Sequence, residues 1–187
     1  MKRDEQKIAE RREKTLSSTE VYKGRILDIY VDEVQLPDGH RSQRELIRHC
    51  HAAAVLAFND KGEVLLEEQY RYPYDDIITE IPAGKGDENE DPKETALREL
   101  EEETGYKANN IELLGLFYPS VGYTDESIHL YLATGLVKTK QHLDEGEYLE
   151  YKFVPFKKFC EMVRNGDIAD GKTLAALSYY LVNYVNR

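Results

Sequence analysis

From residue 84 to residue 106 the chain reads GKGDENEDPKETALRELEEETGY, and this stretch decides how the whole sequence is interpreted. Asp91 can accept hydrogen bonds from the free N–H groups at a helix start, and Pro92 suits the first helical position. Gly105 suits the left-handed conformation that ends many helices. An apolar stripe with helical spacing consists of Ala96, Leu97 and Leu100. The stretch therefore predicts a loop followed by a helix that begins at Asp91 and Pro92 and ends at Thr104.

Acidic residues crowd the end of this predicted helix. Glu99, Glu102 and Glu103 stand at positions i, i+3 and i+4, so their carboxylates share one face. Like-charge pairs at these spacings cost roughly 0.2–0.5 kcal/mol each, and the negative end of the helix dipole disfavours them further. A hard cation reverses this balance, because Mg²⁺ takes oxygen ligands and is commonly held by a few carboxylates and substrate phosphates. The alternative is a solvated acidic face, in which Lys93 and Arg98 relieve the repulsion.

The spacing of the fixed residues in this stretch favours the metal site. Gly84 is followed by five residues and Glu90, and then by seven residues and the run RELEEETGY, which begins at Arg98 and ends at Tyr106. This pattern resembles the Nudix box at every defined position. The chain is therefore identified as a member of the Nudix hydrolase family. The resemblance implies an α/β (α+β) fold of the Nudix type, an α/β/α sandwich with a mixed β-sheet.

The resemblance also implies a role for each box residue. Glu99, Glu102 and Glu103 correspond to metal ligands, and the backbone carbonyl of Ala83 corresponds to a further ligand. Arg98 resembles the arginine that orients a box glutamate, and Arg98 and Glu103 are the catalytic candidates of the box. The supporting positions are Gly84, Glu90 and Gly105. The implied cofactor is Mg²⁺, with Mn²⁺ as the alternative.

Composition excludes several other classes of protein. The 187 residues suit one domain, and 36 acidic against 25 basic residues give a net charge of −11. A nucleic-acid binder needs a basic surface, so none is expected, whereas a phosphate-containing small molecule needs only a metal or a few arginines. No run approaches the ~18 apolar residues of a membrane span, and the charged N-terminus is unlike a signal peptide. Cys50 and Cys160 lack metal-ligand spacing and are predicted to be reduced thiols of a cytoplasmic protein.

The first fifty residues predict a small antiparallel β unit. Residues 2–15 alternate acidic and basic side chains, which predicts a solvated helix or a frayed arm. Residues 21–36 are rich in strand formers, and the LPDG sequence at residues 36–39 predicts a turn. Residues 44–49 are predicted to be the returning strand. We therefore expect residues 1–50 to form an arm and an antiparallel unit, and the family resemblance implies that this unit serves dimerisation and substrate contact.

Residues 51–187 are predicted to form the Nudix domain. The continuous apolar run at residues 52–58 predicts a buried strand. Further strands are predicted at residues 63–69 and 77–81. The loop and helix described above follow the last of these strands.

Segments outside the box resemble the ADP-ribose pyrophosphatase branch of the family, over residues 21–185. They are LPDG at 36–39, QRE at 43–45, EQYR at 68–71, EIPAGK at 80–85 and DGKTLAAL at 170–177. By position, Arg44 and Arg71 would contact phosphate or ribose oxygens, for which arginine is well suited. Tyr30 would stack on the base and Glu80 would read the base edge. Each could instead be an ordinary strand residue, packed on the core in the case of Tyr30 and exposed in the case of the arginines.

A loop after the box supplies a further acid in this branch, and here it reads YPSVGYTDE at residues 118–126. Glu126 is the candidate for the catalytic or metal-assisting acid, and Asp125 is the alternative. A mobile loop suits this role, because closure on a substrate excludes water. The chain departs from the branch where relatives read Ser-Pro-Gly, since it has Ser120-Val121-Gly122. That departure leaves the identity of the sugar open.

These observations predict Mg²⁺-dependent hydrolysis of the pyrophosphate bond of a nucleoside diphosphate sugar. ADP-ribose is the first choice, with AMP and ribose 5-phosphate as products. The alternatives are another nucleotide sugar, such as GDP-mannose or UDP-glucose, and a non-catalytic Nudix-fold sensor that binds ADP-ribose. The resemblance also implies a homodimer formed through the N-terminal strands.

Overall fold

The computed structural model describes residues 4–185, and the chain divides into two compact units. One unit, called the N-terminal unit, comprises residues up to His49 together with Ser120–Glu126. The other, called the core unit, comprises Cys50–Pro119 and the residues from Ser127 onward. The loop that carries Glu126 therefore belongs with the N-terminal strands and not with the helix of the box. In the described residues, no helix is long and apolar enough to cross a membrane.

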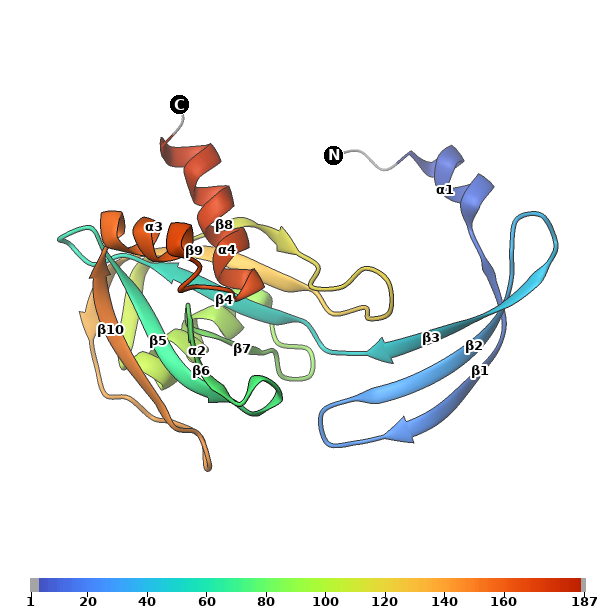
Figure 1. Ribbon diagram of the computed structural model, residues 1–187, viewed down its shortest axis with the longest axis horizontal. Coiled ribbons are helices and arrows are strands. Elements are labelled where there is room, and N and C mark those ends of the chain that lie inside the picture. The colour runs from blue at the N-terminus through green and yellow to red at the C-terminus, as the bar shows by residue number, and fades with distance from the viewer. Residues whose placement is uncertain (1–3, 186–187) are drawn as a thin grey trace. The chain divides into compact units, whose positions relative to one another are not determined.

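The N-terminal unit is a short helix followed by a three-stranded antiparallel sheet in the order β1-β2-β3 (Figure 1). Its elements are α1 (Glu5–Arg11), β1 (Lys14–Lys23), β2 (Asp28–Gln35) and β3 (Arg41–Arg48). The predicted turn at residues 36–39 is confirmed, because the Gly39 N–H donates to the Leu36 carbonyl at 2.9 Å and Gly39 has a φ of +90°. The start of β1 was not predicted. Its ten residues are all exposed and mostly polar, so they lack the alternation that marks a half-buried strand.

Backbone hydrogen bonds attach the Ser120–Glu126 loop to the end of β3. The Ile47 N–H donates to the Tyr123 carbonyl at 2.7 Å, and the Asp125 N–H donates back to the Ile47 carbonyl at 3.2 Å. The Asp125 carboxylate adds a third link, because its Oδ1 accepts the His49 N–H at 2.8 Å. The loop therefore lies beside the end of β3, where Thr124 forms a parallel bridge with Ile47, and it is held largely by its backbone.

The core unit contains a four-stranded sheet, β7-β4-β9-β8, and a three-stranded antiparallel sheet, β10-β5-β6 (Figure 1). In the first, β4 runs parallel to β9 and antiparallel to β7, so the sheet is mixed. The strands are β4 (Ala52–Ala57), β5 (Glu63–Arg71), β6 (Asp76–Glu80), β7 (Ala83–Lys85), β8 (Tyr106–Phe117), β9 (Ile128–Lys138) and β10 (Leu149–Pro155). The other elements are η1 (Tyr72–Tyr74), α2 (Pro92–Thr104), α3 (Phe156–Asn165), α4 (Gly171–Tyr180) and η2 (Leu181–Val185). The three predicted strands of this unit are confirmed.

Helices cover both faces of the central strand β4, whose six residues are all buried. On one face Ala54 and Leu56 pack in a cluster with residues of α3 and α4, among them Phe159 and Leu177. On the other face Ala53, Val55 and Ala57 pack in a cluster with Ala96 and Leu100 of α2. A strand buried on both faces reads as a continuous apolar run, which is why the sequence alone revealed it. The predicted α/β/α sandwich is confirmed.

Helix α2 begins and ends where the sequence predicted. The Asp91 side chain accepts a hydrogen bond from the Lys93 N–H at 2.9 Å, and Pro92 is the first helical residue. Gly105 ends the helix with a φ of +65°, and its N–H donates to the Glu101 carbonyl at 2.7 Å. The helix lies between β7 and β8 in the chain and contacts both, as well as β4. This packing fixes the orientation of the glutamates along it.

Candidate metal and substrate site

The three box glutamates of α2 differ sharply in burial. Glu103 is only 3% exposed, and its Oε2 accepts the Ala83 N–H at 2.9 Å, which joins the helix to β7. The Glu99 side chain is 14% exposed, and the Glu102 side chain is 37% exposed. The helix therefore presents a graded set of carboxylates, from a buried one that is held by the backbone to one that faces solvent.

Arg98 binds the acidic residues of the box together. Its Nε and Nη2 donate to Glu90 at 3.0 and 2.9 Å, and its Nη1 donates to both Glu99 and Glu102 at 2.9 Å. A further bond from Nη2 reaches the Lys85 carbonyl at 3.0 Å. One guanidinium thus contacts three carboxylates, which relieves the like-charge repulsion that the sequence predicted for this helix.

The box glutamates have strongly perturbed pKa values. The hydrogen bonds from Arg98 lower the pKa of Glu90 to about 2. Burial raises the pKa of Glu99 to about 7, even though Arg98 acts in the opposite direction. Burial, followed by the negative charges of Glu67 and Glu99, raises the pKa of Glu103 well above its ordinary value. Carboxyl groups that are costly to ionise when alone are stabilised as anions by a nearby cation.

Gly84 gives the loop backbone close access to this cluster. A Cβ built on Gly84 would lie 2.0 Å from the carboxyl carbon of Glu99. Any larger residue at position 84 therefore occupies the space that the Glu99 carboxylate now fills. The box glycine is explained by this contact and not by its own backbone angle.

These residues fit a divalent cation. They offer several carboxylate oxygens, the donors that Mg²⁺ and Mn²⁺ prefer, and they lie at a half-buried position where a cation would offset the cost of ionising Glu99 and Glu103. Among the described residues, no three His, Cys, Asp or Glu side chains are arranged closely enough to hold a metal ion. Arg98 accounts for this, because it holds Glu99 and Glu102 against itself. An ion that binds them would replace contacts of Arg98.

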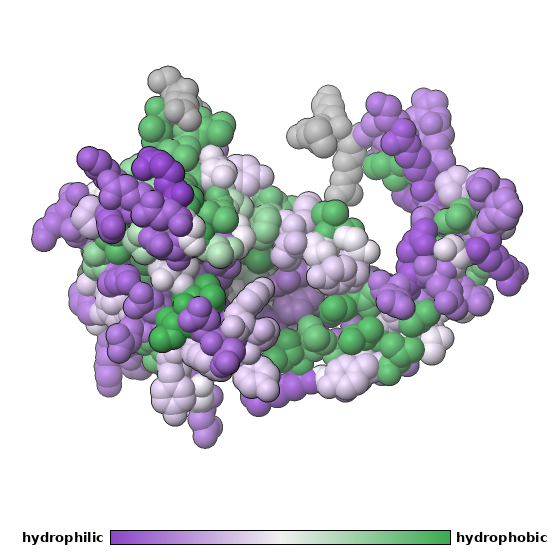
Figure 2. Space-filling model, viewed as in Figure 1, coloured by the Kyte–Doolittle hydropathy of each residue, from purple (hydrophilic) through white to green (hydrophobic). Residues whose placement is uncertain are grey.

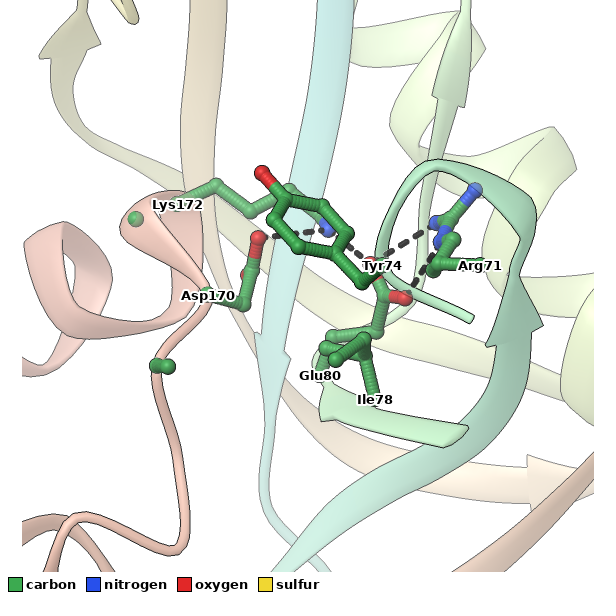
Figure 3. Close-up of a pocket in the computed structure, with 8 residues that line it drawn as sticks. Arg71, Tyr74, Ile78, Glu80, Asp170 and Lys172 are labelled. Carbon is green, nitrogen blue, oxygen red and sulfur yellow. Dashed lines mark hydrogen bonds and ion pairs between the residues drawn. The ribbon is translucent and has the colours of Figure 1, made fainter. Parts of the chain in front are cut away.

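A pocket of about 270 Å³ lies at the N-terminal end of α4, where Arg71 and Glu80 meet the DGKT sequence of residues 170–173 (Figure 3). Arg71 Nε and Nη2 donate to the two carboxylate oxygens of Glu80 at 2.7 and 2.8 Å. Lys172 donates to the same carboxylate and lies 3.2 Å from Asp170. Burial opposes the ionisation of Glu80, but these bonds and charges outweigh it and lower the Glu80 pKa.

Glu67 lies in the core unit near both Glu103 and Glu80. It is fully buried on β5, and among the described residues its carboxyl group has no hydrogen-bond partner other than the carboxyl group of Glu103. Burial, together with the charge of Glu80, raises the Glu67 pKa to about 8. The charge of Glu67 contributes to the raised pKa of Glu103, whereas a hydrogen bond with Glu103 acts to lower the pKa of Glu67.

Comparisons with known proteins agree with the geometry of the box. A family model described as NUDIX domain matches residues 31–177, and one described as Nucleoside diphosphate sugar hydrolase N-terminal domain matches residues 13–47. The chain belongs to the Nudix hydrolase family. Members of this family generally use divalent metal ions, in keeping with the carboxylates of α2.

Several curated proteins are similar over most of their length. The ADP-ribose pyrophosphatase of Bacillus subtilis (strain 168) is 41% identical over 169 residues, covering 89% of this chain and 91% of that protein. The methanol dehydrogenase activator of Bacillus methanolicus is 43% identical with the same coverage. A GDP-mannose pyrophosphatase of Yersinia enterocolitica is 35% identical over 146 residues, covering 73% of this chain and 76% of that protein.

The fold also matches a solved structure. The crystal structure of an ADP compounds hydrolase superposes with a TM-score of 0.83 at 20% sequence identity, covering 94% of this Nudix chain and 97% of the other. At that identity the likeness concerns the fold, and it supports the sandwich arrangement described above.

The candidate residues of the N-terminal unit are described separately, since that unit is distinct from the one that carries the box. The Tyr30 hydroxyl donates to Glu20 at 3.0 Å, and the Arg48 guanidinium lies 5.9 Å from the centre of the Tyr30 ring. Arg44 Nη2 is 2.6 Å from Glu13. Their roles toward a substrate stay predictions.

The loop acids, Asp125 and Glu126, differ in what they contact. Asp125 uses both carboxylate oxygens, one for the His49 N–H and the other for Arg48 at 3.2 Å. The Glu126 carboxylate lies 3.7 Å from the His49 ring, and its side chain is 26% exposed.

Two residues of the core unit were missed by sequence reasoning. Lys172 stands within a segment that resembles the ADP-ribose branch, yet that resemblance assigned it no role. Glu67 follows the apolar residues Val64–Leu66 of β5 and precedes Glu68, so its neighbours in the sequence gave no signal that it is buried. Within the core unit the structure brings together Ala83, Gly84, Glu90, Arg98, Glu99, Glu102 and Glu103 as one cluster and Arg71 and Glu80 as a pocket.

Proposed function

We propose that this Nudix hydrolase cleaves the pyrophosphate bond of a nucleoside diphosphate sugar, with ADP-ribose as the preferred substrate and AMP and ribose 5-phosphate as products. The observation that carries the proposal is the cluster of box carboxylates with raised pKa values on α2. Similarity to two ADP-ribose pyrophosphatases and to GDP-mannose pyrophosphatases supports the substrate class.

We assign Mg²⁺ to the box, with Mn²⁺ as the alternative. Glu99, Glu102 and Glu103 would hold it together with the backbone carbonyl of Ala83. When bound, the ion supplies charge neutralisation at the pyrophosphate and lowers the pKa of the attacking water. Arg98 and Glu90 orient the ligands before an ion binds, because Arg98 contacts Glu99 and Glu102 and Glu90 is its bidentate partner.

Other residues bind the substrate and move the proton. Arg71 would contact the phosphates, and Arg44 and Tyr30 of the N-terminal unit would contact the phosphate or ribose oxygens and the base. We assign the proton-accepting role to Glu126 in preference to Asp125. In support of this choice, both oxygens of Asp125 are engaged with His49 and Arg48, whereas the Glu126 side chain is partly exposed.

A substrate panel tests this proposal. Hydrolysis of ADP-ribose, GDP-mannose and UDP-glucose is measured at equal concentrations with Mg²⁺, with Mn²⁺ and with a chelator. We expect turnover that requires a divalent ion and is fastest with ADP-ribose. Faster turnover of another sugar would change the preferred substrate, and tight binding of ADP-ribose without turnover in any metal would favour the sensor instead.

Variants test the residue assignment. Glu103→Gln and Glu126→Gln are expected to reduce kcat by about 10²-fold or more, the scale associated with general acid–base groups. Glu101→Gln is the matched control, because Glu101 lies on the same helix but pairs with the exposed Lys107 at 3.2 Å. Unchanged turnover in Glu103→Gln would reject the metal role, and loss in Asp125→Asn without loss in Glu126→Gln would reverse the choice of base.

We also propose a homodimer formed through the N-terminal unit. Figure 2 shows apolar residues among the polar ones on the strands of this unit. Its exposed large apolar side chains are Ile8, Leu16, Val21, Tyr22, Ile26, Leu27, Val121 and Tyr123. A three-stranded sheet needs an apolar face packed against something to be stable, and among the described residues of this unit only Asp32 and Val34 are buried. Light scattering on the purified chain distinguishes a dimer from a monomer. The cytoplasmic location stays an expectation.

A further inference from the structure

The DGKT sequence at residues 170–173 forms a connection between α4 and the end of β6, the strand that carries Glu80. Asp170 caps α4, because its Oδ2 accepts the Thr173 N–H at 2.9 Å and the Thr173 hydroxyl at 2.6 Å. The Thr173 hydroxyl in turn accepts the Ile81 N–H at 3.0 Å. The residue next to Glu80 is therefore held by its backbone from the same turn of α4 that presents Lys172.

Lys172 uses this position to reach Glu80 from the side opposite Arg71, as Figure 3 shows. The Lys172 side chain is 11% exposed and the Glu80 side chain is 2% exposed, so their ion pair is largely removed from water. Burial alone would lower the Lys172 pKa, but the charges of Asp170 and Glu80 raise it above its ordinary value. The Lys172 amine is therefore a charged group in this pocket at neutral pH.

The Glu80 carboxylate is shared between two cations, and this determines how Arg71 is presented. Glu80 holds Arg71 through Nε and Nη2, while the third guanidinium nitrogen, Nη1, takes no part in this bidentate pair. The Arg71 side chain is still 39% exposed. One edge of the guanidinium is therefore fixed and the other is left for a ligand.

The charges of the pocket balance only if Lys172 is present. Among the residues that line the pocket, Arg71 and Lys172 carry two positive charges, and Glu80 and Asp170 carry two negative ones. Glu67 also interacts with Arg71 and Lys172, but burial raises its pKa to about 8, so it adds little negative charge at neutral pH. Without Lys172 the pocket has a net negative charge, and the buried Glu80 would be neutralised by Arg71 alone. A diphosphate would then meet a carboxylate excess in a half-buried place, where charge interactions are strong.

We propose that Lys172 is a positioning residue for substrate binding: it offsets the charge of Glu80, so that Glu80 fixes the Arg71 guanidinium without cancelling its attraction for the diphosphate. This inference rests on the proposed function, in which Arg71 contacts the phosphates. In this inference Glu80 holds Arg71. It does not contact the base edge, which was the role that the sequence suggested. The DGKT sequence is thereby explained as the segment that carries the balancing cation.

Steady-state kinetics with ADP-ribose tests the inference. We expect Lys172→Met to raise KM by about tenfold or more with kcat changed by less than about threefold, the signature of lost uniform binding. Lys172→Arg keeps the charge and should restore most of the affinity. Lys152→Met is the matched control, because it removes a lysine from an exposed pair with Glu68. An unchanged KM in Lys172→Met, or an equal loss in Lys172→Arg, would overturn the inference.

A double variant separates charge balance from a loss of structure. Lys172→Met combined with Glu80→Gln removes one charge of each sign, so the pocket returns to balance. We expect the double variant to bind better than Lys172→Met alone, although not as well as wild type, because a glutamine amide holds the guanidinium less firmly than the Glu80 carboxylate does. A double variant that binds as weakly as Lys172→Met, or more weakly, would contradict charge balance. Melting temperatures of all variants identify any that fail to fold.

Calorimetric binding of α,β-methylene ADP-ribose keeps the two proposals distinguishable, since this analogue cannot be hydrolysed at the bridging position. Wild type that binds the analogue but hydrolyses no nucleotide sugar would defeat the proposed function. The inference would then still be decided by whether Lys172→Met binds the analogue more weakly than wild type does. Equal affinity of wild type and Lys172→Met for the analogue, or no binding by either, would overturn it.

Discussion

Glu67 on β5 lies directly opposite Glu80 on β6, and the two carboxyl groups are in opposite electrostatic situations. Glu80 accepts bonds from Arg71 and Lys172, and its pKa is lowered. Among the described residues Glu67 accepts no hydrogen bond from a cation, and burial raises its pKa to about 8. The same short stretch of sheet therefore contains one carboxylate stabilised as an anion and one carboxyl group that favours the neutral form.

This difference predicts a pH-dependent stability that Glu67 causes. The folded-state pKa of about 8 lies above the ordinary value of 4.5, so the native state favours the protonated form. The contribution of Glu67 to the free energy of unfolding is complete below the ordinary pKa of the carboxyl group. It is lost as the pH rises from there to about 8. Glu67→Leu should be more stable than wild type at pH 8 and should lose less stability between pH 5 and pH 8.

Urea unfolding in chelator at pH 5, 6.5 and 8 measures this effect. Glu67→Gln is the control, since it has no titration but keeps a buried polar group. Parallel pH profiles for wild type and Glu67→Leu would show that Glu67 is ionised or partnered in solution.

Gly84→Ala is predicted to damage the metal site without unfolding the chain. The new Cβ would lie 2.0 Å from the carboxyl carbon of Glu99, and this flexible side chain can move aside. Displacing a ligand should weaken Mg²⁺ binding by about 10–100-fold, the scale seen when groups that orient metal ligands are removed. Calorimetric titration of Mg²⁺ measures the affinity, and circular dichroism monitors folding.

A double variant checks that the effect passes through Glu99. Gly84→Ala and Glu99→Gln should each weaken Mg²⁺ binding, and their combination should be no weaker than the worse single variant. Additive losses would mean that Gly84 acts on the site by another route.

Arg98 is predicted to stabilise the chain most when divalent ions are absent. We expect Arg98→Gln to lower the free energy of unfolding by about 2–3 kcal/mol in chelator, less than the ~3–5 kcal/mol of a fully buried pair, because the Arg98 side chain is 30% exposed. Excess Mg²⁺ should narrow this difference, since an ion can take over the contacts with Glu99 and Glu102. Denaturant unfolding with and without Mg²⁺ gives both values.

Lys107→Gln provides the comparison for Arg98. It removes a surface pair with Glu101, whose expected worth is less than about 1 kcal/mol, and it should respond to Mg²⁺ as wild type does. A deficit in Arg98→Gln that is the same with and without Mg²⁺ would argue that ions do not replace the guanidinium.

Gly105→Ala is predicted to destabilise the chain more than the same change at another helix end. Gly105 and Gly166 end α2 and α3 with φ angles of +65° and +82°. Both substitutions place alanine in the left-handed region, which costs about 1–2 kcal/mol of conformational free energy. A Cβ on Gly105 would also lie 2.6 Å from the backbone nitrogen of Gln141, whereas one on Gly166 meets nothing within 4 Å. Thermal melts of the two variants should separate them, with Gly105→Ala melting lower; equal melting temperatures would count against the contact.

The sequence predicted those parts of the fold and site that depend on neighbouring residues. Asp91, Pro92 and Gly105 mark the ends of α2 through local hydrogen bonds and backbone angles, so the helix was predicted with its correct bounds. The box cluster followed from spacing along the same helix. The pairing of Lys172 with Glu80 joins residues that are 92 positions apart, and nothing in either local sequence indicates it.

The start of β1 escaped prediction for a different physical reason. All ten of its residues are exposed, and a strand without a buried face has no alternating pattern to reveal it. The burial of Glu67 was likewise not predicted, because the burial of a side chain depends on tertiary packing and not on the residues next to it in the sequence.

The hydrogen bonds from Arg98 to three carboxylates affect how the protein responds to the concentration of divalent ions. The Arg98 guanidinium already supplies a positive charge to these carboxylates, so we expect the chain to stay folded without a bound metal. We expect loading to be a reversible exchange, in which the guanidinium withdraws as an ion arrives and returns as it departs. Catalysis would then rise and fall with the free divalent ion around the protein, while the fold persists through both conditions.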